Sequence, residues 1–199
     1  MEFLEPLYKN VVMFFDCQNL FGSVKNLWKY SYPNYNPIEL SRLVISKEFP
    51  ERCKLTGIRL YTGIHNISIN PKWHSFWNKK LLAHKSQDSR VYFFTKPLLY
   101  SDNVPREKGI DVRIVLDLVR MARLNEYDIA VLFSQDNDFS EVAEEIRSIA
   151  IEKQRWIKIA SAYPFDQLNV KIRGVNKTDW IKLSKNEYDS CIDSADYRQ

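Results

Sequence analysis

The chain has 199 residues, of which 45% are hydrophobic, 14% aromatic and 27% charged; this composition excludes a disordered chain and predicts one domain that folds alone. No apolar stretch approaches the roughly 20 residues that span a bilayer. The first ten residues, MEFLEPLYKN, lack the basic-then-apolar order of a signal peptide. We therefore expect a cytoplasmic protein without a membrane partner. The net charge of +4 is uneven, because residues 186–199 carry a net −3 and the other 185 residues carry +7; we expect one domain over residues 1–185 and an acidic, flexible tail over residues 186–199.

The first half of the chain alternates between strand and helix patterns. Five consecutive apolar residues over 11–15 predict a buried strand that stops at Asp16. Helices over 20–29 and 37–49, a strand over 54–64, a helix over 71–84 and a strand over 90–95 are expected to follow.

The second half continues this alternation after one interruption. Residues 96–107 have no period and contain two prolines, so a loop is expected there. We then expect a helix over 108–123, a strand over 128–133, a helix over 139–150, a strand over 156–161 and a short strand over 180–183. Strands that alternate with helices predict an α/β fold, with a mostly parallel sheet covered by helices on both faces.

Aspartates stand where several of these elements begin or end. Asp16 ends the first strand, Asp111 lies in the first turn of an expected helix, and Asp136 and Asp138 follow the strand over 128–133. Because parallel strands bring their carboxyl ends to one edge of a sheet, these carboxylates are expected to be neighbours. Clustered carboxylates suit Mg²⁺ or Mn²⁺, which take further ligands from water and from a phosphate-bearing substrate. The first hypothesis is therefore a metal-dependent phosphodiesterase.

Each segment also has a structural interpretation. Asp16 and Asn19 could simply shape a turn and cap the next helix, and we weigh the two interpretations equally. In SQDND, one residue suffices as a cap, so the others are free for other work. Asp117 lies about 120° around its helix from Asp111, between two leucines, and is expected to be a buried hydrogen-bonding residue rather than a direct metal ligand.

Taken together, FFDCQN, KGIDVRIVLD and SQDNDF resemble the NYN domain, a branch of the PIN-like nuclease superfamily, and in particular its bacterial subgroup with FxDxxN, KGxDvxLxxD and SxDxDF motifs. The matches are ordered and correctly spaced over residues 11 to about 161. The matching residues are Phe14, Asp16, Asn19, Lys108, Gly109, Asp111, Leu116, Asp117, Ser134, Asp136, Asp138 and Phe139. The resemblance implies a three-layer α/β/α sandwich with PIN-like (Rossmann-like) topology.

The same resemblance implies an endoribonuclease-type hydrolase that uses Mg²⁺ or Mn²⁺ and acts on single-stranded RNA. The sequence leaves open whether the protein forms a homo-oligomer. Four residues are expected to be catalytic and to bind the metal: Asp16, Asp111, Asp136 and Asp138. Four more are expected to orient ligands or contact the substrate: Asn19, Ser134, Lys108 and Asp117. The basic body of the chain would attract phosphates.

Two positions depart from the family pattern. Cys17 and Gln135 stand where glycine is common, and a side chain at 135 could narrow the approach to the metal or alter the turn. The alternative is thus a catalytically weak or inactive PIN-like module that binds RNA or a protein partner in regulation. A haloacid-dehalogenase-type phosphatase also starts with an aspartate after the first strand, but it requires DxD where this chain has Asp16-Cys17-Gln18, and we rank it last.

The remaining chemistry-bearing residues have mainly structural interpretations. The helix from Pro71 mixes aromatic and basic residues and could bind single-stranded RNA, but we favour buried aromatics and solvated lysines. Its histidines and His65 share no metal-ligand spacing and are expected to be structural or at the surface. Three widely spaced cysteines without a CxxC pair predict free thiols and no structural zinc.

Overall fold

The computed structural model describes residues 3–102, 104–167 and 172–198. Its central sheet has the strand order β3-β2-β1-β6-β7-β8, and every neighbouring pair is parallel. The strands are β1 (Lys9–Asp16), β2 (Cys53–Ile64), β3 (Val91–Pro97), β6 (Ile129–Phe133), β7 (Lys158–Pro164) and β8 (Asp179–Leu183). The helices are α1 (Cys17–Trp28), α2 (Pro37–Glu48), α3 (Pro71–Gln87), α4 (Ile110–Arg123), α5 (Ser140–Glu152) and α6 (Lys185–Asp189), with a short 3₁₀ turn η1 (Asn137–Phe139) before α5.

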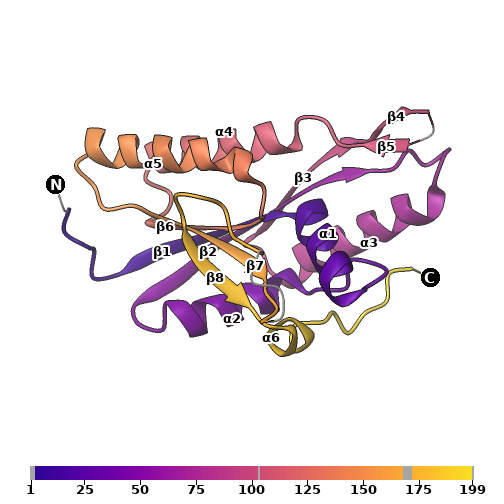
Figure 1. The fold of residues 1–199 in the computed structure, drawn as a ribbon, viewed down its shortest axis with the longest axis horizontal. Helices are drawn as coiled ribbons and strands as arrows, with labels where there is room; N and C mark the ends of the chain where they lie inside the picture. The colour runs from indigo at the N-terminus through magenta and orange to yellow at the C-terminus, as the bar shows by residue number, and fades with distance from the viewer. Residues whose placement is uncertain (1–2, 103, 168–171, 199) are drawn as a thin grey trace.

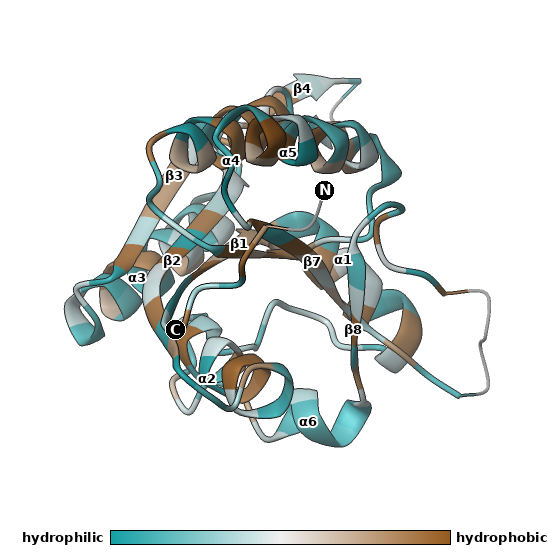
Figure 2. Cartoon of the chain, turned by 90° about the vertical axis from the view of Figure 1, so that its left-hand side faces the viewer, coloured by the Kyte–Doolittle hydropathy of each residue, from teal (hydrophilic) through white to brown (hydrophobic). Residues whose placement is uncertain are grey.

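Helices cover both faces of the sheet, which confirms the expected α/β/α sandwich. Helices α4 and α5 lie on one face, and α1, α2, α3 and α6 lie on the other (Figures 1 and 2). Strand β1 separates two hydrophobic clusters, because Val11, Met13 and Phe15 pack towards the α1–α3 side while Val12 and Phe14 pack towards α4 and α5. All five of these side chains are buried, as the apolar run predicted.

The strand order places Asp16 at the switch point of the sheet. From β1 the chain moves to β2 and β3 on one side, whereas β6, β7 and β8 lie on the other side. Loops that leave adjacent strands in opposite directions create a crevice at the carboxyl edge, which is where ligands bind in open α/β sheets. The fold therefore presents the end of β1 as a binding position.

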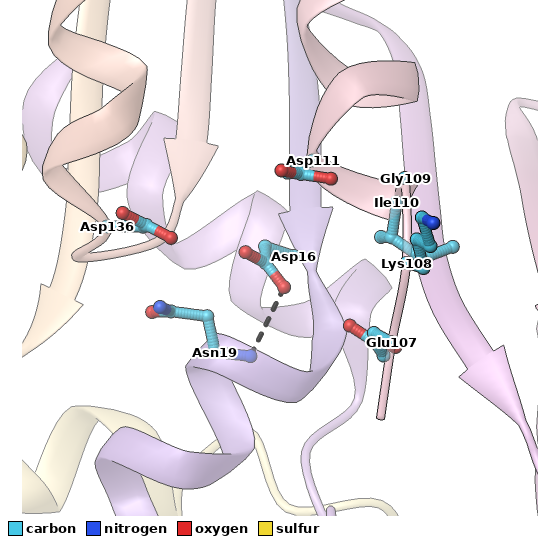
Figure 3. A pocket seen from close by; sticks show the side chains of 8 residues that line it. All are labelled: Asp16, Asn19, Glu107, Lys108, Gly109, Ile110, Asp111 and Asp136. Carbon is cyan, nitrogen blue, oxygen red and sulfur yellow. Dashed lines mark hydrogen bonds between the residues drawn. The ribbon is translucent and has the colours of Figure 1, made fainter. Parts of the chain in front are cut away.

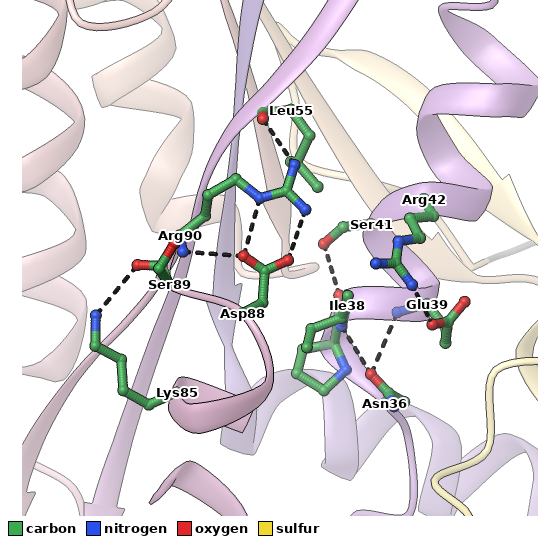
Figure 4. Close-up of polar contacts among 11 residues, drawn as sticks. Asn36, Ile38, Glu39, Ser41, Arg42, Leu55, Lys85, Asp88, Ser89 and Arg90 are labelled. Atoms are coloured by element: carbon green, nitrogen blue, oxygen red, sulfur yellow. Dashed lines mark hydrogen bonds and ion pairs between the residues drawn. The ribbon is translucent and has the colours of Figure 1, made fainter. Parts of the chain in front are cut away.

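Side-chain caps fix where elements begin and end on the α2–α3 side (Figure 4). Asn36 Oδ1 accepts hydrogen bonds from the backbone N–H groups of Ile38 and Glu39 at 2.9 and 3.2 Å, so α2 starts at Pro37. The guanidinium of Arg90 donates to Asp88 and also to the carbonyl of Leu55 at 3.1 Å. This fork ties the turn after α3 to β2 and sets the start of β3.

The prediction of a loop over residues 96–107 was wrong in part. This segment contains an antiparallel hairpin of β4 (Leu99–Ser101) and β5 (Val104–Arg106), and β3 continues to Pro97. Proline is tolerated on edge strands, where no neighbour needs its missing N–H, and both Pro97 and Pro105 lie on such strands. Because proline is typical of loops, the sequence pattern could not distinguish the end of β3 and the strand β5 from a loop.

Residues 186–198, which we expected to form a flexible tail, pack against the sandwich. Tyr188 and Cys191 are buried, and the side chain of Asp193 is only 6% exposed. Asp193 Oδ2 lies 3.0 Å from both Lys80 Nζ and His84 Nε2. Lys80 is therefore buried rather than solvated, which corrects the expectation for α3, although the buried Phe76 and Trp77 agree with it. Within the described residues, no helix has the length and apolar character needed to cross a membrane.

Candidate functional site

A pocket of about 420 Å³ opens at the carboxyl end of β1. Its lining comes from the end of β1, the start of α1, the approach to α4 and the segment after β6 (Figure 3). The lining residues are Asp16, Asn19, Glu107, Lys108, Gly109, Ile110, Asp111 and Asp136. Three of the four aspartates expected at the site thus share one cavity.

Asp16 is the buried carboxylate of the pocket, with 8% of its surface exposed. It accepts hydrogen bonds from the Asn19 backbone N–H at 3.2 Å and from Ser134 Oγ at 3.3 Å. Burial raises the pKa of Asp16 to about 6 although these two hydrogen bonds lower it, and the nearby charges of Asp136 and Asp111 raise it by smaller amounts. Among the residues that the structure describes, the carboxylate of Asp16 forms no ion pair.

Glu107 is a fourth carboxylate in the pocket, and sequence reasoning missed it. It stands at the end of the segment expected to be a loop, and its carboxylate accepts a hydrogen bond from the backbone N–H of Gly63 at the end of β2. Burial raises the pKa of Glu107 to about 7, with further contributions from the charges of Asp16 and Asp111. The only sequence signal was its place directly before Lys108 and Gly109 of the KGxD motif.

The segment after β6 is held against α1 by the two residues expected to orient the site. Asn19 Oδ1 accepts a hydrogen bond from the backbone N–H of Gln135 at 2.9 Å, and the hydroxyl of Ser134 accepts one from Asp136 N at 3.2 Å. Since Ser134 Oγ also contacts Asp16, it joins the ends of β1 and β6. Asp136 Oδ1 accepts a hydrogen bond from Asp138 N at 3.0 Å and caps η1. The side chain of Asp136 thus enters the pocket from a braced turn.

The start of α4 supplies the opposite wall. Gly109 has a φ of +76°, a left-handed conformation that glycine adopts without the strain of a Cβ atom, and it is followed directly by the first turn of α4. Asp111 lies in that turn, where the helix dipole favours negative charge. Lys108 is exposed and lines the pocket.

Three of the expected site residues do not line the pocket: Ser134, whose contacts are given above, Asp138 and Asp117. Asp138 is exposed, and its backbone rather than its side chain contacts Asp136. Asp117 is 2% exposed and accepts a hydrogen bond from the Tyr61 hydroxyl at 2.9 Å. Its Oδ2 also lies 3.1 Å from Arg113 Nε and 3.4 Å from Arg59. Asp117 therefore joins α4 to β2 as a buried hydrogen-bonding residue, the position expected for it.

The two departures from the family pattern leave the pocket open. The side chain of Gln135 donates from Nε2 to the carbonyl of Arg173 at 2.9 Å, and Gln135 does not line the cavity. The thiol of Cys17 is buried, and burial raises its pKa to about 12, so it stays protonated. Neither side chain narrows the approach to Asp16.

The donor set fits a hard divalent cation. In the part of the chain that the structure describes, no three His, Cys, Asp or Glu side chains are arranged to hold a metal ion among themselves. Mg²⁺ is usually bound by only one or two carboxylates and completes its shell with water and substrate phosphate. Burial raises the pKa of Asp16 to about 6, and a cation bound beside this carboxylate would favour its ionised form.

Comparisons with known proteins concern the family and the fold of the chain. The family model for the NYN domain matches residues 10–163. No curated protein matches the chain. Among solved structures, a protein of unknown function from Vibrio parahaemolyticus is similar, with a TM-score of 0.55 and 15% sequence identity over 92% of this chain and 98% of that chain. That likeness concerns the fold alone.

Proposed function

This chain belongs to the NYN domain family of nuclease-like domains, and we propose that it is a metal-dependent endoribonuclease that hydrolyses single-stranded RNA in the pocket around Asp16. The observation that carries the proposal is the convergence of Asp16, Asp111, Asp136 and Glu107 on one cavity. Within residues 3–102, 104–167 and 172–198, none of these four forms an ion pair. Such an uncompensated cluster suits a site that receives a cation together with a phosphate.

Asp16, Asp111 and Asp136 would hold Mg²⁺ or Mn²⁺. When bound, such an ion supplies positive charge for the phosphodiester and makes water more acidic. Asp16 would be the anchor, because its carboxylate is buried and fixed by Asn19 and Ser134. Asp138 has no place in this ligand set because it does not line the cavity.

The other lining residues would handle phosphate charge and protons. Lys108 would contact a non-bridging oxygen of the phosphodiester. Water would attack phosphorus and release a proton to the solvent, the bond from phosphorus to the leaving ribose oxygen would break, and Glu107 would give its proton to that oxygen and be reprotonated from the solvent. A pKa of about 7 suits Glu107 for this task, since a general acid works best when its pKa is close to the working pH.

The regulatory alternative loses the support it had from sequence. It was based on side chains in place of glycine at Cys17 and Gln135, and neither side chain enters the pocket. An open cavity with its acids in place favours catalysis. The net +7 of residues 1–185 favours a polyanionic substrate.

The test is cleavage of an end-labelled single-stranded RNA in Mn²⁺. Asp136→Asn should reduce the rate by about a hundredfold or more, because it removes a charge that acts directly at the reaction centre. Asp138→Asn makes the same charge change two residues away, outside the pocket, and should retain the rate to within about tenfold. Undiminished cleavage by Asp136→Asn would contradict the proposal.

A further inference from the structure

A second cavity of about 340 Å³ lies at the same edge of the sheet, beyond the ends of β2 and β3. Its floor and rim are largely apolar, with contributions from Ile64, Ile67 and Pro97. Ile67 is 60% exposed, so its apolar surface is accessible to a ligand in the cavity. The function proposed above does not use this cavity.

The polar groups around the cavity have unsatisfied hydrogen-bonding capacity. Asn78 and Thr95 are half-buried, and among the described residues their side chains have no hydrogen-bond partner. His74 Nδ1 lies 2.7 Å from the carbonyl of His65. A carbonyl only accepts, so Nδ1 carries the proton, and Nε2 of the neutral ring is left as an acceptor. An amide, a hydroxyl and an imidazole nitrogen thus surround an apolar cavity, which is the usual composition of a small-ligand site.

The two cavities are close neighbours. Gly63, which holds Glu107 of the first cavity, is followed directly by Ile64 of the second, and successive residues of a strand are about 3.3 Å apart. Lys96 lines the second cavity, and its Nζ lies 3.0 Å from where a Cβ atom on Gly109 of the first cavity would stand. A cation therefore lies between an acidic pocket and an apolar one.

This arrangement matches one nucleotide beside a scissile phosphate. A nucleobase is flat and apolar on its faces and carries donors and acceptors on its edge, whereas its phosphates are anionic. The cavity offers apolar contacts from Ile64 and Ile67 for the faces, Asn78 and Thr95 for the edge, and Lys96 for a phosphate. Burial lowers the pKa of His65, so its ring is neutral near pH 7 and can contact a base without added charge.

We propose that the second cavity binds the unstacked base of the RNA nucleotide next to the scissile phosphate and thereby gives the enzyme a base preference at that position. The inference rests on the proposed ribonuclease function. It also requires single-stranded RNA, because a base in a duplex is stacked and paired and cannot enter a cavity.

Binding without cleavage tests this inference. Fluorescein-labelled hexamers of A, C, G and U are titrated with the full chain in EDTA, and anisotropy gives four dissociation constants. We expect wild type to prefer one base, and Asn78→Ala to weaken binding of that hexamer about threefold to tenfold, the loss of one neutral hydrogen bond. Thr95→Val, which removes a hydroxyl at nearly constant shape, should reduce the same preference. Asn26→Ala, on the exposed surface of α1, is the matched control and should bind like wild type.

Equal affinity of wild type for all four hexamers, or an unchanged preference in both Asn78→Ala and Thr95→Val, would overturn the inference. Cleavage in Mn²⁺ separates this failure from failure of the proposed function. If the wild-type protein cleaves RNA and both variants keep its base preference, only the proposed base site is refuted. If the base preference disappears in the variants but the wild-type protein never cleaves RNA, only the nuclease assignment is refuted.

Discussion

A hydrogen bond joins Gly63, in β2, to Glu107, in the connection between β5 and α4, at the edge of the pocket: the N–H of Gly63 donates to the carboxylate of Glu107. A Cβ atom at position 63 would lie 2.8 Å from Glu107 Oε1 and would also meet the side chain of Leu98. Glycine at 63 is therefore needed for close approach, and it places the fourth acid of the pocket.

Gly63→Ala should displace Glu107 and lower the rate of RNA cleavage by about tenfold or more, because a misplaced catalytic group loses much of its effect. Gly22→Ala is the matched control, since a Cβ atom there meets nothing within 4 Å. Gly22 lies inside α1, so its replacement should raise the free energy of unfolding by about 0.5–1 kcal/mol. Chemical denaturation and a cleavage assay of both variants check these outcomes; equal activity of the two variants would refute the role of Gly63.

Glu107→Gln should lower kcat for RNA cleavage by about a hundredfold, the lower end of what a general acid contributes. Because Lys108 and the three aspartates stay in place, KM should change little. The dependence of the rate on pH gives the sharper readout. The wild-type rate should fall above about pH 7 as Glu107 loses its proton, and this decrease should be absent in Glu107→Gln. A variant with the wild-type profile would exclude Glu107 as the proton donor.

The stability of the metal-free protein should fall as pH rises from about 4 to about 7. Burial raises the pKa of Asp16 and of Glu107 in the folded chain to about 6 and about 7, so the native state binds more protons than the unfolded state over this range, and ionisation destabilises it. Urea denaturation in EDTA should show the decline, on the order of 5 kcal/mol for the two groups together. Asp16→Asn should flatten it, and an equally steep decline in that variant would contradict the assignment to Asp16.

The strands, helices and covering of the sheet could be predicted from the sequence because each has a local cause. Five apolar residues before Asp16 predicted a buried strand, and the amphipathic patterns predicted the helices. The three aspartates of the pocket were also accessible, because they occupy the ends of elements whose position in a parallel sheet follows general rules.

Other features depend on contacts that no local pattern contains. Glu107 joins the pocket because the backbone of Gly63, 44 residues earlier, binds it. Asp138 does not line the cavity: its backbone N–H donates to the carboxylate of Asp136 at the start of η1, and its side chain is exposed. The acidic composition of residues 186–199 suggested a tail, but Asp193 neutralises a lysine buried in α3.

Asp193→Asn should destabilise the protein by about 3–5 kcal/mol, because it leaves Lys80 buried without its counter-charge. Burial opposes ionisation of Asp193, but His84 and Lys80 outweigh it and lower the pKa to about 2. The stabilisation is therefore complete above about pH 4 and is lost as pH falls towards 2. Asp196→Asn, on the exposed part of the same segment, should leave the denaturation midpoint unchanged. Equal midpoints for both variants at pH 7 would show that the Asp193 contact does not hold this segment.

The most direct test of the metal-dependent site is the position of manganese in a crystal. Crystals soaked in millimolar Mn²⁺ should give an anomalous peak in the pocket, about 2.1 Å from a carboxylate oxygen of Asp16 and from one of Asp111 or Asp136. The peak should be absent in Asp16→Asn crystals soaked in the same way. No peak in the wild-type pocket, or one bound only by residues outside it, would contradict the account.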